Sequence, residues 1–171
     1  PYVGTLLFQR SDGWYSCSGT LLSKTTVLTA AHCTFGNLRT YFMNSEDVLA
    51  TRGAGEDLEQ WLRNDWIEAT AAIPHPQYVP GQYPSTYDVG IVKLGKGGVK
   101  LSTYGQLPQQ GLLDTLSGQG KKDAFTVVGH GHAHAGLAAA EGAHGYAAAR
   151  LGERLGSVAY QVGHDLHDVV A

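Results

Sequence analysis

A histidine and an aspartate in this sequence lie in settings that suit acid–base chemistry. His32 follows a β-prone run at residues 27–31, and Asp88 precedes an apolar run at residues 89–94. A histidine that acts as a general base has to be held in one orientation beside the nucleophile. An aspartate that fixes the tautomer of such a histidine is expected to be largely buried at the edge of a strand. Plainer interpretations are a buried core histidine for His32 and a strand-capping carboxylate for Asp88.

Two cysteines, Cys17 and Cys33, flank the first of these segments. On spacing alone, two free thiols and one disulfide are both open. A disulfide would pin the short strand and turn that carry His32, and it would indicate an oxidising compartment.

Taken together, four motifs resemble those of the trypsin-like serine proteases, which have the chymotrypsin fold. Residues 17–22 read CSGTLL and residues 28–33 read LTAAHC, where the family has C-[SG]-G-[TS]-L and then T-A-A-H-C. Residues 75–78 read HPQY and residues 87–94 read YDVGIVKL, where the family has H-P-x-Y and then D-[IV]-[AG]-[LI] before K-L. Gly90 stands where the family usually has alanine.

The resemblance implies roles for these residues. His32 would accept the proton of the nucleophilic serine and later protonate the leaving amine, while Asp88 orients its ring. Cys17 and Cys33 would form a disulfide, and His75 would be a structural loop residue. The family also implies secretion and a protein or peptide substrate, and we expect no cofactor and no metal.

The nucleophile of the family is not recognisable in this chain. In the family it lies in a G-D-S-G-G-P turn, whose N–H groups also form the oxyanion hole, and no such motif occurs here. Ser117 lies in a linker, and Ser157 has neither an acidic residue before it nor a glycine pair after it. We therefore predict that neither is the nucleophile and that the chain as given is inactive.

Short strands separated by glycine- and proline-rich turns predict an all-β barrel or sandwich in the first part of the chain. The expected strands cover residues 3–8, 14–22, 27–31, 67–73 and 89–94, and residues 11–13 are a turn. The resemblance specifies a chymotrypsin-like Greek-key barrel, with the second barrel truncated and replaced by a tail rich in Ala, Gly and His. The acidic stretch at residues 56–68 is expected to be a solvated loop, with a calcium loop as the alternative.

The predicted organisation has four parts. Residues 1–104 form the first barrel, and residues 105–124 form an interbarrel linker. Residues 125–131, FTVVGHG, resemble the strand that opens the second barrel, with His130 at a position that is commonly aromatic. Residues 132–171 are an atypical tail, either a frayed helix or disordered.

Three interpretations of the tail are open. His130, His132 and His134 alternate, so on a strand they would share one face and could bind zinc, copper or nickel. A stripe of apolar residues at helical spacing favours a helix, which Gly145, Gly152 and Gly156 would weaken. The loss of several residue types after about residue 129 favours a shifted reading frame in a GC-rich gene. We favour the third.

Composition and charge exclude several classes of function. The net charge of −3 gives no basic excess for nucleic acid. No apolar run approaches the roughly 18 residues of a membrane span, and no signal peptide is visible in the first ten residues. The remaining functions are a serine endopeptidase by lineage, a non-catalytic binding module or truncated gene product, and a histidine-rich metal binder. The oligomeric state is not predictable from these residues.

Overall fold

Six strands form the main body of the structure. The computed structural model describes residues 1–82, 87–112, 126–130 and 149–150. The strands are β1 (Val3–Arg10), β2 (Gly13–Ser23), β3 (Thr26–Thr29), β4 (Arg39–Met43), β5 (Ile67–Pro74) and β6 (Gly90–Leu94).

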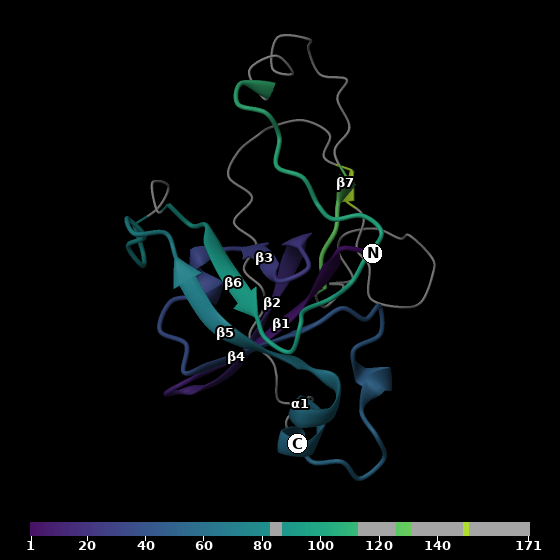
Figure 1. The fold of residues 1–171 in the computed structure, drawn as a ribbon. Helices are drawn as coiled ribbons and strands as arrows, with labels where there is room; N and C mark the ends of the chain where they lie inside the picture. The colour runs from purple at the N-terminus through teal and green to yellow at the C-terminus, as the bar shows by residue number, and fades with distance from the viewer. Residues whose placement is uncertain (83–86, 113–125, 131–148, 151–171) are drawn as a thin grey trace.

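These strands close into an antiparallel barrel in the order β1-β2-β3-β6-β5-β4, with β4 pairing back onto β1 (Figure 1). The chain leaves β3, crosses to β4 and returns through β5, so β6 lies between β3 and β5. This order is that of a Greek-key barrel, and it confirms the predicted fold class. β4 was not among the expected strands, although its sequence RTYFM is rich in β-prone residues.

The strands β1 and β4 are buried on both faces over most of their length, which explains the short apolar runs at residues 6–8 and 41–43. Leu6 and Phe8 of β1 point into the barrel, whereas Leu7 between them points outward. Phe42 of β4 likewise belongs to the barrel interior. The interior is completed by residues of β2, β3 and β6 and by one residue of the 3-10 turn that follows β3: Cys17, Leu21, Val27, Cys33, Val92 and Leu94.

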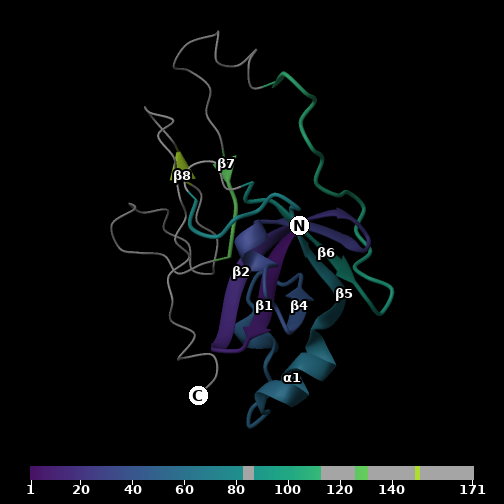
Figure 2. The same ribbon diagram turned by 90° about the vertical axis from the view of Figure 1, so that its left-hand side faces the viewer.

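A helix covers the outer face of β1 and β4, where we expected a solvated loop. The helix α1 (Leu58–Asp65) lies at one end of the barrel in both views (Figures 1 and 2). Trp61 and Leu62 of this helix are buried in a second apolar cluster. The cluster also contains Leu7, Tyr41, Met43 and Trp66.

The acidic residues of this stretch start and anchor the helix. Asp57 accepts a hydrogen bond from the Gln60 N–H, and the Gln60 side chain accepts one from the Asp57 N–H, which makes a capping box. Glu59 pairs with Arg39 at 2.8 Å. Glu56 accepts from the side chain of Asn64 at 2.7 Å. Because the carboxylates serve these partners, the alternative of a calcium loop has no support in the described residues.

Two short 3-10 turns complete the barrel region: η1 (Ala31–Cys33) and η2 (Leu49–Thr51). The strand expected over residues 27–31 therefore ends at Thr29, and the turn η1 carries His32. After β6 the chain runs back along β2 and β3, where the N–H groups of Val99 and Gly105 donate to Lys24 and Leu21.

The later part of the chain is described only at β7 (Thr126–Val127), at the residues just after it and at β8 (Ala149–Arg150). The two strands pair with each other in an antiparallel manner. The rest of the predicted tail and most of the predicted linker lie outside the described residues, and the four-part division of the chain stays a prediction. Among the helices that the described residues form, none has the length and apolar character needed to cross a membrane.

Candidate active site

A disulfide fixes the turn that carries His32. Cys17 on β2 and Cys33 in η1 are bonded to each other, with their Cα atoms 6.3 Å apart. Both residues are buried. The separation is within the range of ordinary disulfides, so the implied pairing is confirmed.

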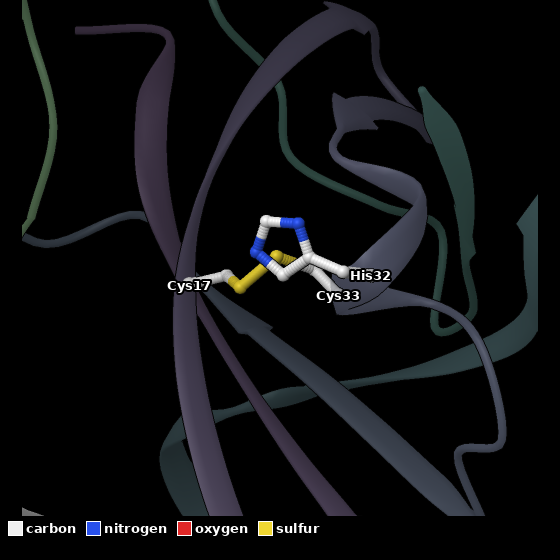
Figure 3. Close-up of side chains that lie close together, drawn as sticks. All are labelled: Cys17, His32 and Cys33. Atoms are coloured by element: carbon white, nitrogen blue, oxygen red, sulfur yellow. A yellow bond between two sulfur atoms is a disulfide. The ribbon is translucent and has the colours of Figure 1, made fainter. Parts of the chain in front are cut away.

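The imidazole of His32 lies beside this disulfide (Figure 3). The two sulfur atoms and a ring nitrogen lie within 4.8 Å of one another, a spacing that would suit a metal. Metal ions bind cysteine as the thiolate, and sulfur atoms joined in a disulfide are not thiolates. This donor set therefore does not fit a metal while the disulfide is intact.

Asp88 contacts His32 through both of its carboxylate oxygens. Its Oδ2 lies 2.8 Å from Nδ1 of the imidazole, and its Oδ1 accepts the His32 backbone N–H at 2.8 Å. A carboxylate can only accept in these contacts, so Nδ1 is the donor. In the neutral ring Nε2 then carries the lone pair, as a general base requires.

Asp88 is less buried than the sequence led us to expect. Its side chain is 29% exposed and that of His32 is 43% exposed. The reason is its place in the chain, because Asp88 lies in the exposed stretch 87–89, two residues before β6 begins at Gly90. In the described residues, the contact between His32 and Asp88 is therefore partly open to solvent.

The main chain around Asp88 is held by the segment that contains His75. Tyr87 has a left-handed backbone conformation, with φ at 48°. Its ring stacks on the His75 imidazole, with centroids 5.0 Å apart and planes 8° from parallel. The His75 N–H donates to the carbonyl of Val89 at 2.9 Å. The contribution of Tyr87 was not predicted, because it depends on contact between two loops.

Gly90 also packs directly against the histidine turn, by which we mean η1 with the residues on either side of it, Ala30 and Thr34. A Cβ atom at this position would lie 2.6 Å from Oγ1 of Thr34 and 3.0 Å from the carbonyl oxygen of Ala30. Thr34 is buried, and its hydroxyl donates to the carbonyl of Ala31. The departure from the family's usual alanine at Gly90 therefore accompanies a threonine side chain that occupies the same space.

Ser18, the neighbour of Cys17, joins the barrel to the segment that follows β7. Its hydroxyl accepts the His130 N–H at 2.7 Å and donates to the His130 carbonyl at 3.1 Å. The other candidates that the sequence suggested, Ser117, Ser157, His132 and His134, lie outside the described residues.

Comparisons with known proteins agree with this fold. The sequence profile of the trypsin family, described as Trypsin, matches residues 1–138, and the chain belongs to that family. The match extends a few residues beyond the resemblance read from the motifs.

Among curated relatives, chymotrypsin-like elastase family member 1 of Bos taurus is 25% identical over 117 residues, which cover 66% of this chain and 41% of that protein. Mast cell protease 3 of Ovis aries is 35% identical over 78 residues, covering 46% of this chain and 27% of that protein. A solved structure titled HL collagenase aligns with a TM-score of 0.55 at 22% identity, over 77% of this chain and 51% of the other. This last likeness concerns the fold alone. The chain thus spans about two fifths or less of the length of these curated relatives.

Proposed function

We propose that this chain carries the general base and the orienting carboxylate of a secreted trypsin-like serine endopeptidase. His32 takes the proton of a serine hydroxyl at Nε2 while that oxygen attacks the substrate carbonyl, and it returns the proton to the leaving amine. Asp88 keeps the Nδ1–H tautomer and stabilises the imidazolium that forms. The substrate is a protein or peptide, as for other members of the family.

The observation that supports this proposal best is the two-point contact between His32 and Asp88. One carboxylate binds both the ring and the main chain of the same histidine, each at 2.8 Å. A strand-capping carboxylate would need only the main-chain contact, so the second contact favours a role in orienting the ring.

A chimera tests the roles of the two residues. Residues 1–131 would be joined to the serine-bearing second half of the bovine elastase relative, and peptidase activity would be measured. We expect an active chimera whose kcat falls by about 10⁴ in Asp88→Asn, because that variant stabilises the wrong tautomer. His32→Ala should be at least as damaging.

Asp65→Asn is the matched control, because Asp65 is an exposed aspartate at the end of α1. It should leave the activity unchanged. An active chimera that tolerates Asp88→Asn as well as it tolerates Asp65→Asn would refute the proposed role of Asp88.

We further propose that the 171-residue chain alone does not hydrolyse peptides. Support comes from the sequence, which contains no G-D-S-G-G-P segment to supply the nucleophile and the oxyanion N–H groups. The purified chain should therefore remain unlabelled by a fluorophosphonate probe, with the bovine elastase relative as the positive control. Covalent labelling of any serine in the chain would contradict this.

A non-catalytic binding module is the second candidate. The closed barrel and its two apolar clusters favour it, because they are built from residues 1–94 together with a few partly buried side chains at residues 99–104. A single cooperative thermal transition of the purified chain would support a stable module. A truncated gene product would instead be supported by a G-D-S-G-G-P segment in another reading frame beyond about codon 129. A metal-binding tail would require zinc or nickel to raise the transition temperature.

Secretion belongs to the same proposal. The disulfide between Cys17 and Cys33 supports it, because such bonds persist in oxidising compartments. Expression of the full gene in its native host, followed by fractionation, would test the location directly.

A further inference from the structure

The carbonyl groups at the end of the turn η1 are bound by side chains. The carbonyl of Ala31 accepts the main-chain N–H groups of Thr34 and Phe35, both at 2.9 Å. The next carbonyl, that of His32, accepts a hydrogen bond from Nη2 of Arg10. The carbonyl of Cys33 accepts from the side-chain amide of Asn37 at 2.8 Å. The last carbonyls of a helical turn lack partners within the turn. Here the side chains of Arg10 and Asn37 donate to the carbonyls of His32 and Cys33.

The two side chains that bind these carbonyls also contact each other. Arg10 Nε donates to Oδ1 of Asn37 at 3.4 Å, and the amide of Asn37 also donates to the hydroxyl of Thr40 at 3.0 Å. The Leu38 N–H donates to the carbonyl of Gln9 at 2.8 Å. The end of β1, the histidine turn and the start of β4 are therefore joined by one hydrogen-bonded network.

The guanidinium of Arg10 is placed by two aromatic rings. Its central carbon lies 5.0 Å from the ring centroid of Phe8 and 5.3 Å from that of Tyr15. These rings stack on each other across the paired strands β1 and β2, with centroids 5.9 Å apart. The hydroxyl of Tyr15 donates to Asp12 at 3.0 Å, a bond that also raises the pKa of Tyr15. Arginine stacks on aromatic rings while its N–H groups stay free to donate.

From this network we infer that Arg10 is a positioning residue of the active site, a role that rests on the proposed function. The main chain of His32 is held on both sides of its Cα atom. Its N–H donates to Asp88, and its carbonyl accepts from Arg10. Fixing both peptide groups fixes the direction of the bond to the side chain, and so keeps the imidazole against the carboxylate.

The test uses the full oxidised chain with the variants Arg10→Ala and Arg10→Lys. One measurement is hydrogen–deuterium exchange of the backbone amides of residues 32–35. The other is the proton NMR resonance of the His32 Nδ1–H, which a hydrogen bond to Asp88 shifts downfield and protects from exchange. Asp88→Asn identifies that resonance by removing it.

Arg39→Ala is the matched control. Arg39 also stacks on a tyrosine, Tyr41, at 5.1 Å, and it pairs with Glu59 on α1, but these contacts lie on the α1 side of the sheet. It therefore reports what the loss of a stacked, hydrogen-bonded arginine does away from the histidine turn.

In Arg10→Ala we expect roughly tenfold faster amide exchange in the turn, as for the loss of a charged hydrogen bond, and a broadened or lost Nδ1–H resonance. Arg10→Lys should give an intermediate result, because one ammonium cannot reach both acceptors as a guanidinium does. Arg39→Ala should leave both measurements as in the unmodified chain.

The outcomes separate this inference from the proposed function. If the unmodified chain shows the resonance and neither Arg10 variant alters it or the exchange, the inference is wrong and the proposed function stands. If Arg10→Ala and Arg39→Ala accelerate exchange in the turn equally, the inference is also wrong. If the unmodified chain lacks the resonance but Arg10→Ala alone accelerates exchange, Arg10 holds the turn and the proposed pairing of His32 with Asp88 fails. If Arg10→Ala does not fold, Arg10→Lys decides by the same criteria.

Discussion

Gly90 and Thr34 illustrate how single residues adjust the histidine turn. They come from different elements, and a Cβ on Gly90 would meet the side chain of Thr34 at 2.6 Å. The family's usual alanine at this position would therefore press against the threonine that fills the space. The two positions are expected to vary together.

We predict that Gly90→Ala destabilises the chain by about 1–3 kcal/mol, the cost of overpacking a buried site. Thr34→Ala removes the atoms that the new methyl group meets first, so the double variant should lose less than the sum of the single losses. Urea unfolding of the four chains measures this coupling. Strictly additive losses would show that the close approach is relieved elsewhere.

The position of the Asp88 carboxylate likewise depends on single residues beside it. Tyr87 adopts a left-handed conformation that non-glycine residues rarely take, and the stack on His75 holds it there. Strain of this kind persists where surrounding contacts enforce it. The loop segments thus place Asp88 on His32 without Asp88 belonging to a strand.

At the scale of the element, α1 supports the barrel from outside. Leu58, Trp61 and Leu62 follow helical spacing and pack on the outward residues of β1 and β4. The rings of Trp61 and Trp66 meet edge to face at 5.3 Å. Strands β1 and β4 are therefore backed by a second apolar cluster on the outside of the barrel.

The cap of α1 gives an element-scale prediction. Asp57→Ala removes the acceptor of the Gln60 N–H and should cost about 1 kcal/mol of unfolding free energy. Asp65→Ala, at the other end of the same helix, should be neutral or slightly stabilising, because a negative charge is unfavourable near a helix C-terminus. Urea unfolding compares the two variants. Equal losses of unfolding free energy in the two variants would mean that the capping box at Asp57 does not stabilise the helix.

At the scale of the whole molecule, the disulfide links the barrel to its candidate site. It closes a loop with a sequence separation of 16 residues between β2 and η1. Because this loop contains β3 and the start of the histidine turn, the bond restricts the unfolded chain and also holds the turn in the folded one.

We predict that the double variant Cys17→Ala and Cys33→Ala loses about 3 kcal/mol of stability, as for other loops of this size. Reduction of the unmodified chain should lower its free energy of unfolding by a similar amount, which would appear as a lower urea midpoint. The measurement is unfolding with and without reductant. A reduced chain that is as stable as the oxidised one would contradict the prediction.

Much of the barrel and the identity of the candidate site residues His32 and Asp88 could be predicted from the sequence. Strands β1, β2 and β5 were predicted almost to their ends, because alternation and turn residues are local signals. The helix α1 was missed although Asp57 and Gln60 have the spacing of a capping box, because its eight residues give only two turns of periodicity. β4 was missed because it has only five residues, although turn-forming residues stand on both sides of it, Gly36 and Asn37 before and Asn44 and Ser45 after.

The sequence by itself indicated the family and marked His32 and Asp88 as the residues to examine, and the family resemblance implied the disulfide between Cys17 and Cys33 that the structure contains. These features are carried by side-chain types at short spacings. The tertiary structure decided that His32 and Asp88, 56 positions apart, meet at 2.8 Å. It also decided that Arg10 binds the carbonyl of His32. Such a contact leaves no pattern in the sequence, because every residue has a carbonyl group and only closure of the barrel brings this one to the arginine.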